Sequence, residues 1–242
     1  MKIKHGFTLA EVVITLGILG ILATIALPML NDSRPNQEMI MLKKVYYLTS
    51  RIVSELINDE DFYPDADKEE DSGFSHVTLM PAAPEAKYHG REYSGDTKFC
   101  GLFAARMNLR DAAPNCTAQS VNSVFPAGSS PRGGTFTTAD NVVWLLPITN
   151  FPNSAGDDGH VADSTGQASL YVDVNGEKPG NCFPNQVVGN GVCSKPDRFE
   201  IKVDRWGKLY IDDDVTRKYL SSSNTTKSYA VIKREIDNGN KS

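Results

Sequence analysis

The chain of 242 residues is long enough for one ordinary domain with an accessory segment. Its 25 lysines and arginines against 30 aspartates and glutamates give a formal net charge of −5. This charge argues against a general nucleic-acid binder, which needs a basic face to displace counterions from phosphates. A protein with several membrane spans is also excluded, because only residues 7–30 hold an apolar run that approaches the roughly 18 residues of a spanning helix.

A short basic leader, residues 1–6, precedes this apolar run. From Phe7 to Leu30, 17 of the 24 residues are apolar, and Glu11 carries the only charge. As a helix the run would be about 36 Å long, enough to cross a hydrocarbon core of about 30 Å. By the positive-inside rule the basic leader stays in the cytoplasm, so we expect a single span with the rest of the chain on the far side.

Two ordinary interpretations of this segment are a cleaved secretory signal peptide and a plain signal anchor. The apolar run is longer than the 7–15 residues or so of a signal peptide, and no small-x-small cleavage site follows it. Neither interpretation accounts for Glu11, because a carboxylate inside a membrane helix is energetically costly.

The sequence around Glu11 resembles the class III signal of type IV pilins and type II secretion pseudopilins. The family pattern is a short basic leader, a glycine, Phe-Thr-Leu-x-Glu and about twenty apolar residues, and the chain reads GFTLAEVVITLGILGILATIALP from Gly6 to Pro28. Pro28 falls at the position of the family's helix kink. The resemblance covers about the first 30 residues.

The resemblance implies an α+β, pilin-like fold: a long N-terminal helix with a membrane half and an amphipathic half, packed on a C-terminal antiparallel sheet of about four strands with enlarged loops. It implies that a prepilin peptidase cuts between Gly6 and Phe7 and methylates the new Phe7 amine. Glu11 would then face the N-terminal amine of a neighbouring subunit. Because a buried charge is tolerated mainly when it is paired, this pairing would set the register of assembly.

The pattern after Pro28 predicts a hinge followed by a second helix, together residues 31–58. Pro35 disfavours helix at the residue before it. From Gln37 to Asn58 apolar residues recur every three or four positions, which indicates an amphipathic helix with one face on a sheet. These apolar positions are Leu42, Val45, Tyr47 or Leu48, Ile52 and Leu56.

Residues 59–141 are expected to form a variable loop region, and residues 142–242 a C-terminal β domain. The first of these opens with an acidic tract that has eight carboxylates between Asp59 and Asp71 and is expected to be a solvated loop. The strands predicted in the β domain are Val142–Ile148, Ser169–Val174, and a hairpin of Arg198–Val203 with Lys208–Ile211. Asp212–Asp214 is expected to be a solvated strand end.

All four cysteines lie in the polar part of the chain, at Cys100, Cys116, Cys182 and Cys193. None forms a CxxC pair, which disfavours a structural zinc site, whereas an even number suits disulfides in an oxidising compartment. Three connectivities are open, and we favour the sequence-local pairs Cys100–Cys116 and Cys182–Cys193.

Motifs of nucleophilic, zinc-dependent or dinucleotide chemistry are absent from the sequence, so we expect no catalysis and no cofactor. Calcium is the one candidate ligand, because oxygen-bearing side chains gather near turns. These side chains belong to Asp157, Asp158, Asp163, Asp173 and Asn175. The alternative is that they form ordinary Asx turns.

The sequence therefore predicts a structural subunit, a minor pilin or pseudopilin, of a type IV pilus or type II secretion-like filament. Its expected partners are prepilin peptidase, sibling pilins or pseudopilins, and an inner-membrane assembly platform. It is expected to wait in the bacterial inner membrane and then join a pilus or periplasmic filament. Two alternatives stay open: a tip-located adhesin or ligand-binding module, and a membrane-anchored domain that does not polymerise.

Overall fold

The computed structural model describes residues 8–32, 36–64, 79, 85–110, 116, 133–147, 167–176, 178, 180–189, 191–225 and 227–239. Its helices are α1 (Leu9–Asp32), α2 (Gln37–Ile57), α3 (Lys98–Ala104), α4 (Asp214–Ser221) and α5 (Tyr229–Gly239). Its strands are β1 (Ala86–Tyr88), β2 (Arg91–Tyr93), β3 (Gly133–Thr137), β4 (Val143–Pro147), β5 (Gln167–Asp173), β6 (Val187–Val188), β7 (Gly191–Val192), β8 (Arg198–Asp204) and β9 (Leu209–Tyr210).

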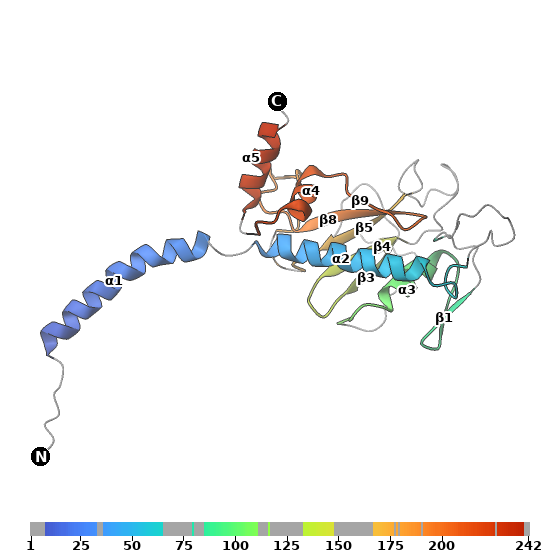
Figure 1. The fold of residues 1–242 in the computed structure, drawn as a ribbon, viewed down its shortest axis with the longest axis horizontal. Coiled ribbons are helices and arrows are strands. Elements are labelled where there is room, and N and C mark those ends of the chain that lie inside the picture. The colour runs from blue at the N-terminus through green and yellow to red at the C-terminus, as the bar shows by residue number, and fades with distance from the viewer. Residues whose placement is uncertain are drawn as a thin grey trace, which may run out of the picture.

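The domain is α+β, with an N-terminal helix and a C-terminal antiparallel sheet, and it fits a pilin-like fold. In Figure 1, α1 stands apart from the body and α2 lies across the sheet. Helices α4 and α5 gather at the end from which α1 leaves, and the β1–β2 hairpin lies at the opposite end.

Helix α2 forms as its periodicity predicts. Asn36 caps its start, since the Asn36 side chain accepts a hydrogen bond from the Met39 amide at 3.1 Å. Its apolar stripe is buried in the core, at Met39, Leu42, Val45, Ile52, Val53 and Leu56. Of the two candidates for the middle of the stripe, Leu48 packs against the core, whereas Tyr47 is exposed.

The main sheet has five strands in the order β3-β4-β5-β8-β9, with every pair antiparallel, one strand more than the four or so expected. Residues that face each other across β5 and β8 form the core face, in the pairs Ala168–Val203, Leu170–Ile201 and Val172–Phe199.

The predicted β8–β9 hairpin is confirmed. Its Gly207 has φ +79° and lies against α2, where an added Cβ would be 3.1 Å from Val53 Cγ1.

Part of the segment expected to be irregular, residues 59–141, is ordered into β1, β2, α3 and β3. Helix α3 is too short to show a periodic signal and is held by tertiary packing. Phe103 of α3 lies 5.8 Å from the Trp144 ring of β4, measured between centroids. Trp144 in turn stacks on Phe136 of β3 at 6.1 Å. These aromatic contacts explain why β3 pairs with β4 although Phe136 is its only large apolar residue.

Residues 142–242, expected to be a C-terminal β domain, end in two helices that were not predicted, α4 and α5. Asp213, predicted to belong to a solvated strand end, caps α4 instead, because its carboxylate accepts hydrogen bonds from the Thr216 amide and hydroxyl at 2.6 and 2.7 Å. The segment between the helices reaches back to the start of α2, where the Asn36 amide donates to the Thr225 carbonyl at 2.6 Å.

Helix α1 is longer at its C-terminal end than expected, because Asn31 and Asp32, assigned to the hinge, are helical. It also continues through Pro28, and Figure 1 shows it as a curved helix. Helices α1 and α2 are separate elements, with residues 33–35 between them outside the described residues. Within the described part of the chain, no helix combines the length and the apolar character needed to cross a membrane.

Candidate functional site

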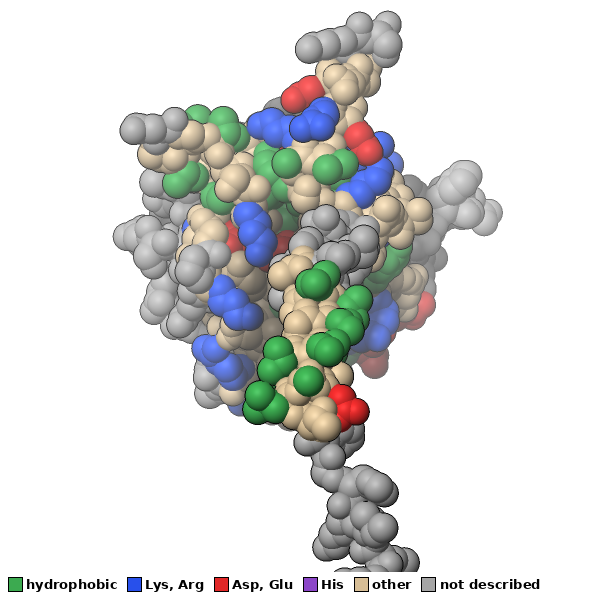
Figure 2. All heavy atoms as spheres, turned by 90° about the vertical axis from the view of Figure 1, so that its left-hand side faces the viewer, with side chains coloured by type: hydrophobic (Ala, Val, Ile, Leu, Met, Phe, Trp, Pro, Cys, Tyr) green, Lys and Arg blue, Asp and Glu red, His purple; other side chains and the backbone are tan. Residues whose placement is uncertain are grey.

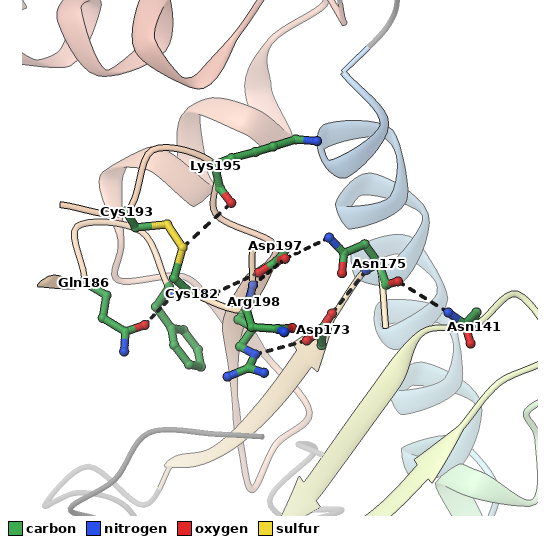
Figure 3. Close-up of polar contacts among 11 residues, drawn as sticks. Asn141, Asp173, Asn175, Cys182, Gln186, Cys193, Lys195, Asp197 and Arg198 are labelled. Atoms are coloured by element: carbon green, nitrogen blue, oxygen red, sulfur yellow. Dashed lines mark hydrogen bonds and ion pairs between the residues drawn. A yellow bond between two sulfur atoms is a disulfide. The ribbon is translucent and has the colours of Figure 1, made fainter. Parts of the chain in front are cut away.

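The carboxylate of Asp197 organises the loop that joins β5 to β8 (Figure 3). Asp197 is fully buried, and one of its oxygens accepts a hydrogen bond from the Cys182 amide at 2.9 Å. The other oxygen accepts from the Asn181 amide at 2.7 Å and from Asn175 Nδ2 at 2.8 Å. Gly180 is required beside it, since an added Cβ there would lie 2.2 Å from Asp197 Oδ2. A single buried carboxylate therefore joins both ends of this loop.

Asp173, at the end of β5, is held by Arg198 of β8. Arg198 Nε lies 3.0 Å from Asp173 Oδ2, and both side chains are largely buried. Burial raises the pKa of the Asp173 carboxyl, and the negative charge of Asp197 adds to the rise, whereas the hydrogen bond from Arg198 opposes it. The two aspartates and the arginine form one buried polar cluster behind the loop.

The loop itself is closed by the disulfide Cys182–Cys193, one of the sequence-local pairs that were favoured. The Lys195 side chain extends toward the start of α2 (Figure 3). It ties the loop to that helix, because Lys195 Nζ lies 2.8 Å from Glu38 Oε1. The second favoured disulfide is also present and links Cys100 of α3 to Cys116, which follows that helix in the chain. Gly134 of β3 lies against this disulfide, and an added Cβ would be 2.3 Å from Cys100 Sγ.

The candidate calcium ligands are only partly covered by the structure. Asp157, Asp158 and Asp163 lie outside the described residues. Asp173 is bound to Arg198, and the Asn175 side chain donates to Asp197. Among the described residues, no group of three or more histidine, cysteine, aspartate or glutamate side chains is placed to hold a metal ion. The calcium site stays a prediction.

The first turn of α1 is closed by Thr8 and Glu11. The Thr8 amide and hydroxyl both donate to Glu11 Oε2, at 2.8 and 2.9 Å, and the Glu11 amide donates to Thr8 Oγ1 at 3.3 Å. This reciprocal arrangement is a capping box, with Thr8 at the N-cap and Glu11 at the third helical position. The capping role of Thr8 was not predicted from the sequence, although the pattern Thr-x-x-Glu before an apolar run is its signal.

Beyond this turn, α1 exposes apolar side chains on all sides. Nine large apolar residues between Leu9 and Leu22 are exposed, and even the least exposed of them, Val12, shows 44% of its surface. Figure 2 shows hydrophobic side chains along the face of the helix turned to the viewer. A helix that is apolar all round is stable when lipid or other helices cover it. The arrangement therefore suits burial among partners.

A comparison with family models identifies this segment. Residues 1–27 match the model described as the prokaryotic N-terminal methylation motif. This is the prepilin-type motif of type IV pilins and pseudopilins. Comparisons with curated proteins and with solved structures found no significant match.

The prepilin motif accounts for the residues singled out at the N-terminus. It supports a type IV pilin or pseudopilin, and it implies processing by a prepilin peptidase and assembly with other pilins. It also indicates an N-terminal membrane anchor and a pilus. Gly6 and Phe7 lie outside the described residues, Glu11 lies in the first turn of α1, and Pro28 lies within that helix.

Proposed function

We propose that the chain is a structural subunit, a minor pilin or pseudopilin, of a type IV pilus or type II secretion-like filament. A prepilin peptidase removes residues 1–6 by cutting between Gly6 and Phe7 and methylates the Phe7 amine. The subunit waits in the inner membrane with a single span and its C-terminal domain outside the cytoplasm. It carries out no catalysis, and its contribution is to filament architecture.

The observation that carries this proposal is the prepilin motif on an apolar helix that the domain leaves uncovered. Burying apolar surface contributes about 25 cal/mol per Å², so mutual burial of such helices among neighbouring subunits favours assembly. The same surface is compatible with lipid before assembly. Storage in the membrane and polymerisation thus use one helix.

Glu11 is the residue that would give neighbouring helices one preferred register in the filament. The capping box holds its carboxylate at the start of α1, against Thr8, the residue that follows Phe7 in the sequence. In a filament that carboxylate faces the amine of a neighbour, and a subunit out of register would leave two uncompensated charges in an apolar surrounding. The pairing therefore favours one register over others.

The proposal of a minor subunit is supported by the elements inserted between α2 and the sheet. Residues 85–110 add a hairpin and a helix to the end of the domain opposite α1 (Figure 1). Such additions enlarge each subunit at its outer end and leave the assembly helix unchanged.

Processing tests the proposal directly. The full chain is expressed with and without a prepilin peptidase, and intact-mass spectrometry measures its N-terminus. We expect loss of residues 1–6 and gain of one methyl group only with the peptidase. Gly6→Val should block cleavage, because a bulky side chain next to the scissile bond obstructs the protease. Gly17→Ala is the matched control, since a Cβ at Gly17 meets nothing within 4 Å.

An unprocessed wild-type chain in cells that process other prepilins would overturn the proposal and favour an anchored domain that does not polymerise. Cleavage followed by recovery in sheared filaments, together with sibling pilins, would support it.

A further inference from the structure

The two faces of the β1–β2 hairpin carry different side chains, and only one of them lies over α3. Its register pairs Tyr88 with Arg91, and Lys87 with Glu92. Because side chains alternate along a strand, Tyr88, Arg91 and Tyr93 share one face, whereas Lys87 and Glu92 share the other and form an ion pair at 2.9 Å. The first face lies over α3, since a Cβ added at Gly101 of that helix would be 2.5 Å from the Tyr93 ring.

Both tyrosine rings on this face are held in place. Tyr93 lies directly on Gly101, where the absence of a side chain makes room for the ring. Tyr88 packs edge-on against Phe62 at 5.7 Å between centroids, and the Arg106 guanidinium lies 4.6 Å from the Tyr88 ring. Rings that are fixed before binding lose little entropy when a ligand arrives.

Between the hairpin and α3 is a half-open cavity of about 330 Å³. This volume lies in the usual range of small-ligand sites. Its polar lining residues are Tyr88, Tyr93, Thr97, His89 and Arg91, and both His89 and Arg91 are exposed. The rest of the lining is apolar and comes from Gly101, Ala104, Ala105, Met107, Leu109 and Cys116. No aspartate or glutamate of the described chain lines it, although the protein as a whole has a net charge of −5.

We propose that this cavity binds one sugar ring that carries a carboxylate, as part of an acidic polysaccharide. The tyrosine rings, together with the apolar lining of Ala104, Met107 and Leu109, suit the C–H face of a pyranose ring. The Tyr88 and Tyr93 hydroxyls can donate to and accept from the hydroxyls of the sugar, whereas the Thr97 hydroxyl, which donates to the Ser94 carbonyl at 3.2 Å, can accept from them. The guanidinium of Arg91 offers the two parallel donors that a carboxylate accepts.

The β1–β2 hairpin and α3, which line the cavity, lie at the end of the domain opposite α1 (Figure 1). A subunit held through α1 would therefore present it outward. Binding at this cavity goes beyond the proposed role in filament architecture and does not depend on processing or polymerisation.

The test uses the full chain in a detergent without a sugar headgroup, and isothermal titration with three probes: D-glucuronate, D-glucose and benzoate. We expect saturable binding of glucuronate, with a Kd about tenfold lower than for glucose or benzoate, because only glucuronate combines the carboxylate with the hydroxylated ring. Arg91→Ala should raise the Kd for glucuronate about tenfold. Lys87→Ala is the matched control, since it removes the same charge from the opposite face of the same hairpin.

No saturable glucuronate binding by the wild-type chain would overturn the proposal. Glucose or benzoate binding as tightly as glucuronate would overturn the assigned ligand class. Equal loss of affinity in Arg91→Ala and Lys87→Ala would show a diffuse charge effect and would also overturn it. An unchanged melting temperature of Arg91→Ala, whose side chain is exposed, separates lost binding from lost fold.

Discussion

The Asp197 carboxylate accepts a hydrogen bond from the Cys182 amide at 2.9 Å and thereby holds the disulfide-closed loop to the start of β8. The backbone repeats the connection, because the Asp197 amide donates to the Cys182 carbonyl at 3.2 Å. Val174, at the end of β5, donates its amide to the Asp197 carbonyl at 2.9 Å. The loop is therefore fixed to the sheet from both sides by one residue.

Asp197→Asn should destabilise the domain although the shape of the side chain is conserved. The amide group would replace one acceptor oxygen and point a donor at the Asn181 or Cys182 amide. A buried unsatisfied group costs about 1–3 kcal/mol, so we expect the free energy of unfolding to fall by about 2 kcal/mol. Urea denaturation of the full chain measures this free energy.

Asp212→Asn is the control. Asp212 is mostly exposed in its pair with Lys202, so the substitution should change the free energy of unfolding by under about 1 kcal/mol. Equal effects of the two variants would contradict the assignment.

Gly134→Ala should disturb the Cys100–Cys116 disulfide from the neighbouring strand. The new methyl group would lie 2.3 Å from Cys100 Sγ, so β3 or α3 must shift. Overpacking of a core typically costs about 1–3 kcal/mol, which we expect to see as a lower melting temperature. Gly191→Ala in β7 places the same methyl group in open space and serves as the control. A Gly134→Ala chain as stable as the control would show that the contact is easily relieved.

Glu11 has two separable roles, as a helix cap and as a charge. Glu11→Gln keeps a capping residue at the third helical position but removes the charge, whereas Thr8→Val removes the cap and keeps the charge. If charge pairing directs assembly, Glu11→Gln and Glu11→Ala should both be processed yet be depleted from sheared filaments. Thr8→Val should assemble, with a loss at the helix end of only about 1 kcal/mol. Normal incorporation of Glu11→Gln would remove the pairing role.

Lys98 should make stability depend on pH. Its side chain is buried, its ammonium donates to the Phe62 carbonyl and lies 4.5 Å from the Tyr63 ring centroid. Burial lowers the pKa of Lys98 from 10.5 to about 8. Because the unfolded chain holds this proton to higher pH, the free energy of unfolding should rise with pH above about 8, by at most about 1.4 kcal/mol per unit.

The rise in the free energy of unfolding is best measured below pH 10. Burial raises the pKa of Tyr63, so above about pH 10 this tyrosine ionises in the unfolded chain but not in the folded one, and stability falls. Lys98→Met removes the titrating amine and gives the reference curve. Wild-type and Lys98→Met curves that run parallel between about pH 8 and 10 would contradict the prediction.

Much of the domain could be predicted where the signal is local. The stripe of α2 and the alternation of β8 appear in the sequence because burial on one face repeats at the period of the element. Asp213 could also have been predicted as a helix cap, because aspartate is a preferred N-cap residue and the apolar Val215 and Tyr219 follow it at helical spacing. Helix α3 and strand β3 could not be predicted, because their stability comes from packing on Trp144 rather than from their own composition.

The sequence by itself determined the N-terminal assembly signal, because every residue of the prepilin motif is contiguous and acts through order along the chain. It also favoured the two disulfide pairs, whose partners are close in sequence. Only the tertiary structure decided how Asp197 joins residues 175, 181 and 182, and how the hairpin and α3 enclose a cavity that no carboxylate of the described residues lines. These arrangements depend on the packing of segments far apart in the chain, and no local pattern encodes that packing.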